Sequence, residues 1–262
     1  MVAPVLRSVG SHGGTTPTET LLKGDAPLAP RLDALDYTGF NRCPYLPMPV
    51  SLALDRLTLS PGAYLRLDAI DWIQFEQILA DLGEHRAIRL AYAHPTLEIR
   101  MPLPEHGRIK ALISHLIVIL LEHLNLPWVS LGSTTFKSPA MAAGIEPDDC
   151  FYIHQVEAIR GKNRLDLAFD PPPDLALEID LTSPTSLSAY QRLGVPEIWR
   201  YSRGKLEILV LSPDGYQSQG MSPTFPQLPI LEQINGLLEQ GDRLLTSEAR
   251  QAFLRWLKTD PR

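Results

Sequence analysis

Acidic side chains recur along two short apolar stretches of the sequence. Residues 174–181 (DLALEIDL) alternate apolar and polar positions, which places Glu178 and Asp180 on one face of a predicted strand. Residues 147–156 (PDDCFYIHQV) predict a second strand, with Asp148 on the same face as Cys150. If the strands are neighbours, the Asp148 and Glu178 carboxylates come close, and a divalent cation would relieve their mutual repulsion. Carboxylate oxygens favour Mg²⁺ or Mn²⁺, which can hold a nucleophilic water.

Other chemistries find less support in the sequence. A solvated polar face is the alternative interpretation for any one of these acids. His106, His115 and His123 share a predicted helix, but their spacing does not give the i, i+4 pair of a helical zinc site. The sequence has no G-x-S-x-G nucleophile elbow and no phosphate-binding G-x-x-x-x-G-K-[ST] loop.

Alternating helical and strand periodicities surround the two acidic strands. Their order predicts an α/β or α+β fold, in which helix 104–125 packs against a central mixed sheet flanked by helices. Hairpins are expected around His94-Pro95 and between 197–202 and 206–212. The helices expected besides 104–125 cover 65–85, 185–193 and two segments of 228–259 divided near Gly241, and a further strand covers 127–137.

Three domain-level segments are expected: a Pro/Gly-rich arm over 1–50, a core over 51–225 and a helical extension over 226–262. The extension could form a homodimer contact or an intramolecular brace, and the sequence leaves both open.

Composition limits the class of protein. The 262 residues are 44% hydrophobic with a net charge of -6, as in a globular protein rather than one that coats nucleic acid. No uncharged apolar run is long enough to span a membrane, and the first 20 residues lack the apolar core of a secretory signal. Two distant cysteines suggest the reducing cytoplasm. Basic clusters at 160–164 and 200–205 are either solvated loops or local nucleic-acid contacts.

Four segments together resemble the Uma-two family of bacterial endonucleases, within the restriction-endonuclease-like PD-(D/E)XK superfamily. The resemblance covers roughly residues 60–212. It is carried by RLAYAHPTLEIRMPLPEHGRIK (89–110), GSTTFKSPAMAAGIEPDDCFYI (132–153), PPPDLALEIDLTSP (171–184) and YQRLGVPEIWRY (190–201).

The resemblance implies a restriction-endonuclease-like core with a Mg²⁺ (or Mn²⁺) site. Asp148 and Glu178 match the two carboxylate ligands of the motif, and the backbone carbonyl of Ile179 completes the shell. Glu105, with His106 beside it, is the matching helical acid. Asp180 stands where typical members have a lysine.

The expected activity is therefore Mg²⁺-dependent hydrolysis of DNA phosphodiester bonds. Asp180 would either widen the site toward a second metal or fill the position without catalysing. Lys110, Lys137 and Arg192 are the candidate replacements for the absent lysine. The alternatives are a catalytically silent nuclease-fold protein that binds nucleic acid or a protein partner, and a hydrolase of another phosphate ester.

Overall fold

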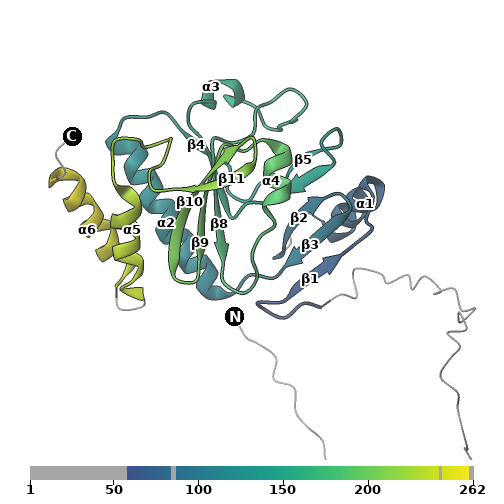
Figure 1. Ribbon diagram of the computed structural model, residues 1–262, viewed down its shortest axis with the longest axis horizontal. Coiled ribbons are helices and arrows are strands. Elements are labelled where there is room, and N and C mark those ends of the chain that lie inside the picture. The colour runs from purple at the N-terminus through teal and green to yellow at the C-terminus, as the bar shows by residue number, and fades with distance from the viewer. Residues whose placement is uncertain (1–57, 84–86, 242–243, 260–262) are drawn as a thin grey trace, which may run out of the picture. The chain divides into compact units, whose positions relative to one another are not determined.

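Two β-sheets form the framework of this computed structural model, which describes residues 58–83, 87–241 and 244–259 (Figure 1). The described residues all belong to one unit of the chain, Ser51–Arg262. The expected arm over residues 1–50 lies outside the described residues.

The first sheet has five strands, all antiparallel, and the second has six, with one parallel pair, β8–β9. The confirmed class is thus α+β with a mixed sheet flanked by helices. In spatial order the first sheet contains β1 (Tyr64–Leu67), β3 (Thr96–Arg100), β2 (Arg89–Ala93), β6 (Ala143–Ile145) and β5 (Phe136–Ser138). The second contains β11 (Gly215–Gln219), β10 (Lys205–Ser212), β9 (Glu197–Ser202), β8 (Leu175–Asp180), β7 (Asp149–Tyr152) and β4 (Val129–Ser130).

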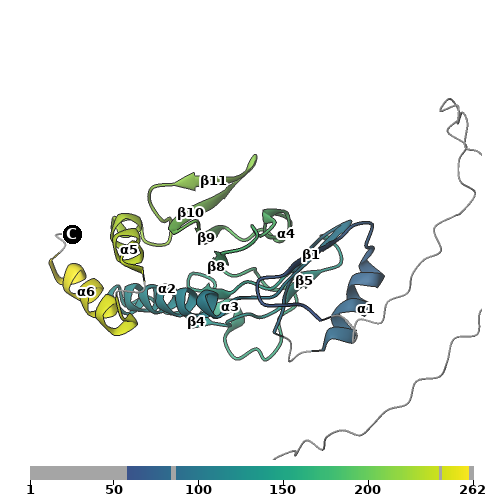
Figure 2. The same cartoon turned by 90° about the horizontal axis from the view of Figure 1, so that it is seen from below.

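The long helix α2 (Pro104–His123) packs along one face of the six-stranded sheet (Figure 2). Its periodic Ile and Leu residues predict a wide buried stripe, and this stripe meets Leu175, Leu177 and Ile179 of β8 in one core cluster. Helices α5 (Ile230–Leu238) and α6 (Thr246–Thr259) join the same cluster. Helix α6 packs against α2, and α5 packs against β10 and α6, so the C-terminal helices pack within the chain.

The opposite face of the six-stranded sheet is also covered. Helix α4 (Leu187–Leu193) packs there together with the short helix α3 (Val156–Ile159), and Ala176 of β8 lies in their shared cluster. Every residue of β8 is consequently buried. The polar face that the alternation of residues 174–181 predicts is an interior face, so its carboxylates are shielded from water.

The β2–β3 hairpin has one apolar and one polar face. Leu90, Tyr92, Leu97 and Ile99 pack with Phe75 of helix α1 (Trp72–Leu82) in a separate cluster. Arg89 and Arg100 lie directly opposite each other in the hairpin register, on the other face. The hairpin expected around His94-Pro95 is confirmed, and its polar face is directed to the six-stranded sheet.

Some expected elements differ in the structure. The segment 65–85 begins as β1 and becomes helical only at Trp72, because Ala69 takes a left-handed φ of 60° and Asp71 then caps the helix by accepting from the Gln74 N–H (2.8 Å). The stretch 127–137 divides between the two sheets, as β4 and β5. Strands β6 and β11 were not expected, since AGI is too short and GYQSQ too polar to show strand periodicity.

Every helix in the described part of the chain is too short or too polar to cross a lipid bilayer.

Candidate active site

Three buried carboxylates gather where β7 and β8 pair. The two strands run antiparallel with Asp149 opposite Leu177, as the sequence predicts for neighbours, and Asp148 directly precedes β7. The Asp148 N–H donates to the Leu177 carbonyl (3.0 Å), and the Ile179 N–H donates to Asp148 Oδ2 (2.8 Å). Asp148, Glu178 and Asp180 are all less than a tenth exposed. Adjacent strands thus bring the expected carboxylates together.

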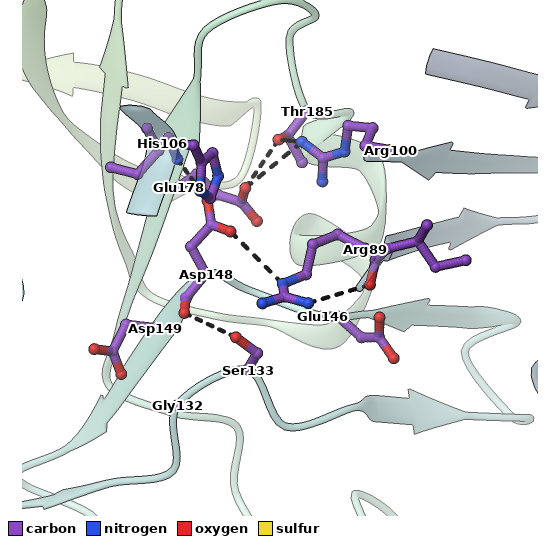
Figure 3. A network of polar contacts seen from close by, with 12 residues as sticks. Arg89, Arg100, His106, Gly132, Ser133, Glu146, Asp148, Asp149, Glu178 and Thr185 are labelled. Carbon is purple, nitrogen blue, oxygen red and sulfur yellow. Dashed lines mark hydrogen bonds and ion pairs between the residues drawn. The ribbon is translucent and has the colours of Figure 1, made fainter. Parts of the chain in front are cut away.

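Two arginines of the other sheet face these acids (Figure 3). Arg100 Nη1 lies 3.7 Å from Glu178 Oε2 and 3.4 Å from Asp180 Oδ1, and Arg89 Nε lies 3.8 Å from Asp148 Oδ1. Two like charges opposite each other in a hairpin are unfavourable on their own. The three acids offset that repulsion, which explains why this register is stable.

Helix α2 contributes a histidine to the cluster. His106, in its first turn, places Nε2 2.9 Å from Asp148 Oδ2. Because an ionised carboxylate only accepts hydrogen bonds, this nitrogen must carry the proton. Glu105, the candidate on the same turn, is exposed and forms no contact with Asp148 among the described residues. The structure therefore brings His106, not Glu105, to the carboxylates.

Thr185 and Tyr190 surround the remaining carboxylate oxygens. Thr185 Oγ1 lies 2.9 Å from Glu178 Oε2 and 2.7 Å from Asp180 Oδ1, and its single proton serves one of them at a time. The Thr185 N–H donates to Asp180 Oδ1 (2.9 Å), and the Tyr190 hydroxyl donates to Glu178 Oε1. The loop after β8 and helix α4 thereby fix both acids.

Three acids share two arginines in this cluster, so one acid lacks a counter-charge when all three are ionised. Burial, together with the nearby Asp148 and Asp180, raises the pKa of Glu178 to about 8 against the opposing effects of Arg100 and of the Tyr190 hydrogen bond. Burial likewise raises the pKa of Asp180. Asp180 Oδ2 and the Nε atoms of Arg89 and Arg100 are buried without a hydrogen-bond partner. Such unsatisfied groups are costly in a folded protein, and a bound ion or ligand would satisfy them.

A cavity of about 30 Å³ opens among Arg89, Arg100, His106, Asp148 and Ile179. It has room for roughly two or three water molecules, or an ion, but not for a nucleotide. In an extended strand the N–H and C=O of one residue point to the same side. Since the Ile179 N–H is directed to Asp148, its carbonyl shares that side.

The carboxylates and the backbone oxygen near this cavity are hard oxygen donors, the type of ligand that divalent cations take. Asp148 Oδ1 accepts no hydrogen bond from the described residues, and Asp148 and Ile179 both border the cavity. Glu178 is not among the residues around the cavity, and its two oxygens accept hydrogen bonds from Tyr190 and Thr185. No three His, Cys, Asp or Glu side chains within the described residues are grouped as a metal centre. A cation here would therefore depend on two carboxylates and a backbone oxygen, with Arg89 and Arg100 supplying further positive charge.

The expected replacements for the absent lysine lie elsewhere. Arg192 donates to the carbonyls of Ala142 (3.1 Å) and His94 (3.0 Å), and Lys137 pairs with Glu76 (2.8 Å). Lys110 is not among the residues around the cavity. The cations that lie beside the acids are the hairpin arginines, Arg89 and Arg100. Their opposition in the register of a hairpin centred on His94-Pro95 marks them as a pair in the sequence, but it does not link them to the acids.

Other buried acids have structural partners. Asp149, next to Asp148, accepts from the hydroxyls of Ser114 (2.6 Å) and Ser130 (2.8 Å), on the side away from the cluster. Asp174 accepts the N–H groups of Ile153 (2.7 Å) and Gln155 (3.0 Å). These satisfied carboxylates hold loops in place, in contrast to Asp180, whose Oδ2 is buried without a hydrogen-bond partner.

Comparison with known proteins adds one match. A family model named Uma2, described as "Putative restriction endonuclease", matches residues 72–240, more than half of the chain. The match spans every residue of the carboxylate and arginine cluster. A search among curated proteins found no relative of the chain.

Proposed function

Since the chain belongs to the Uma2 family of restriction-endonuclease-like proteins, we propose that it hydrolyses DNA phosphodiester bonds with the help of Mg²⁺ or Mn²⁺. The observation that carries this proposal is the convergence of Asp148 and Glu178, from adjacent segments, with two arginines of the other sheet. Buried carboxylates in excess over their counter-charges suit a cation, and arginines beside them suit a phosphate.

The proposed cation ligands are the carboxylates of Asp148 and Glu178 and the carbonyl of Ile179. When bound, the cation would lower the pKa of water and neutralise charge on the phosphate. His106 Nε2–H and the Ile179 N–H both donate to Asp148 Oδ2, so they hold this carboxylate with Oδ1 directed to the cavity. The Ser133 hydroxyl donates to the Asp148 backbone carbonyl (3.0 Å) and fixes the main chain there.

Arg89 and Arg100 would bind the non-bridging oxygens of the phosphate that is cleaved. A guanidinium stays protonated throughout, so each can stabilise developing negative charge but cannot act as a base. Asp180 and Thr185 hold Arg100 in place through the contacts of its Nη1. Asp180 is thus proposed to position Arg100. Glu105 has no role in this proposal, because its side chain is exposed and is not among the residues around the cavity.

The test combines metal binding with cleavage. Mn²⁺ titration by calorimetry should give a binding heat for the wild type that Asp148→Asn and Glu178→Gln abolish, with Glu157→Gln, an exposed acid on α3, as the matched control. Plasmid and single-stranded DNA with Mg²⁺ or Mn²⁺ should be cleaved by the wild type and the control. Equal Mn²⁺ binding by all four proteins would refute the metal site.

The second candidate is a catalytically silent protein of the same fold. The observation that favours it is the acid at the usual lysine position, with the Arg100 guanidinium beside both Glu178 and Asp180. Intact DNA binding with no cleavage under either metal would assign this function. Cleavage that Glu178→Gln abolishes would exclude it.

A further inference from the structure

The carboxyl ends of β8 and β9 lie side by side because these two strands are parallel. Asp180, the last residue of β8, is opposite Ser202, the last residue of β9. The chain then turns through Arg203 and Gly204, with φ angles of 51° and 83°, and returns at Lys205 opposite Ser202. Two left-handed residues in a two-residue hairpin turn fix its direction. The turn therefore holds Arg203 and Lys205 beside the end of β8.

A cavity of about 590 Å³ lies between this turn and the loop that follows β8. We name it the turn cavity, and its residues include Asp180, Thr182, Ser183, Arg200, Arg203 and Lys205. Its volume falls within the range of about 300–1,000 Å³ that small ligands occupy, so one or two nucleotide units fit where the smaller cavity admits only water or an ion. Thr182 and Ser183 border both cavities, which makes the two adjacent.

The turn cavity has positive charges without acidic partners. Arg200 Nη2 donates to Glu207 (2.8 Å), but its Nε is buried without a hydrogen-bond partner. Arg203 and Lys205 are exposed, and no ion pair to either occurs within the described residues. Asp180, the other acid at the cavity, is already engaged by Arg100.

The other basic cluster in the sequence, residues 160–164, has acidic partners for two of its cations. Arg160 pairs with Glu157, and Lys162 pairs with Asp170. Those cations are largely neutralised by their own neighbours, whereas the cations of the turn remain available on a chain whose net charge is negative. The structure thus separates two clusters that look alike in the sequence.

We propose that the turn cavity binds the phosphate backbone of a DNA strand, next to the bond cleaved at the carboxylate cluster. This inference rests on the proposed function. Arg203 and Lys205 each contact a phosphate, and the Thr182 and Ser183 hydroxyls can donate to phosphate oxygens as the strand continues toward Arg100. Contacts of this kind fix the position of a strand and do not read its sequence. Exposed cations along an open cavity suit an extended polyanion better than a small enclosed anion.

The test measures DNA affinity without cleavage. A fluorescent duplex is titrated with protein in EDTA, and the dissociation constant is measured by anisotropy at several salt concentrations. The variant Arg203→Asn/Lys205→Gln removes both charges, and asparagine tolerates the left-handed φ at position 203. Arg255→Gln/Lys258→Gln, on the exposed face of α6, removes the same charge elsewhere and is the matched control.

The turn variant should bind roughly ten- to a hundredfold more weakly at 0.1 M salt, and its slope of log affinity against log salt should be smaller by about two. The control should match the wild type. Equal affinities of the turn variant and the control would overturn the inference. It would also be overturned if the protein bound duplex RNA through the turn and did not bind DNA.

The outcome for the proposed function is read separately, from cleavage with Mg²⁺ or Mn²⁺. Cleavage by the wild type with unchanged DNA affinity of the turn variant would refute the turn cavity alone. DNA binding that depends on the turn, in a protein that cleaves nothing, would support the turn cavity and refute the nuclease activity.

Discussion

Glu178→Gln should make the metal-free protein more stable at alkaline pH. The wild-type carboxyl is fully buried beside Asp148 and Asp180, and burial raises its pKa from 4.5 to about 8. Below about pH 4.5 the group is protonated whether the chain is folded or unfolded. Between 4.5 and 8 the folded protein retains a proton that the unfolded chain releases, so stability falls as the pH rises. Glutamine has nearly the same shape and does not ionise, and the variant therefore escapes this loss.

The size of the effect follows from the pKa difference. The pKa difference between 4.5 and about 8, at about 1.4 kcal/mol for each pKa unit, lowers the free energy of unfolding of the wild type by at most roughly 5 kcal/mol. The variant and the wild type should thus differ little at pH 5. At pH 8 the variant should be more stable by several kcal/mol.

Urea denaturation in EDTA at pH 5, 6.5 and 8 measures this difference. The control is Glu157→Gln, which changes an exposed side chain. Its free energy of unfolding, plotted against pH, should run parallel to that of the wild type. Parallel curves for Glu178→Gln as well would refute the raised pKa. Adding Mn²⁺ at pH 8 should stabilise the wild type and leave Glu178→Gln unchanged, because only the former retains both proposed carboxylate ligands.

Two further predictions concern the core. Burial raises the pKa of Cys150 to about 12, so its thiol should react slowly at pH 8. In a Cys43→Ser protein, a thiol reagent should therefore label Cys150 only as fast as the chain unfolds. Rapid labelling of the native protein would contradict the burial of Cys150. Gly144→Ala places a methyl group 2.7 Å from Cζ of Phe75, which is stacked on Tyr92, and should lower the free energy of unfolding by about 1–3 kcal/mol. Gly107→Ala in helix α2 is the control in thermal unfolding, because its added Cβ meets no packed neighbour within 4 Å outside the adjacent helix backbone, and alanine favours the helix. This control should not lower the melting temperature, and a Gly144→Ala protein that melts no lower than the wild type would refute the clash.

Local periodicity was sufficient to predict the elements with a strong apolar pattern. The stripe of helix α2, the β2–β3 hairpin and strand β8 follow from side chains that repeat at helical or strand spacing. Strands β6 and β11 carry no such pattern. They are held in place by pairing with β2 and β10 respectively, and this pairing is not visible in the local sequence. The division of the strands into two sheets likewise depends on pairing between distant segments.

The acids of the candidate site were identifiable from their positions, and their partners were not. Asp148 and Glu178 stand out because carboxylates interrupt apolar strands. Thr185, Tyr190 and Arg100 reach Glu178 from three separate segments, and no local spacing links them to it. For the same reason the exposed Glu105 and the inward His106 cannot be told apart by sequence adjacency alone.

The positions of Asp148, Glu178 and Asp180 within apolar stretches are evident from the sequence alone, because each carboxylate interrupts a local pattern. The positive charges that lie beside these acids are evident only from the folded chain. Arg89 and Arg100 lie on a hairpin of a different sheet, and they reach the carboxylates because the apolar face of that hairpin packs on α1 and leaves the polar face directed inward. Long-range packing places the charges, since an ion pair depends on distance in space and not on separation along the chain.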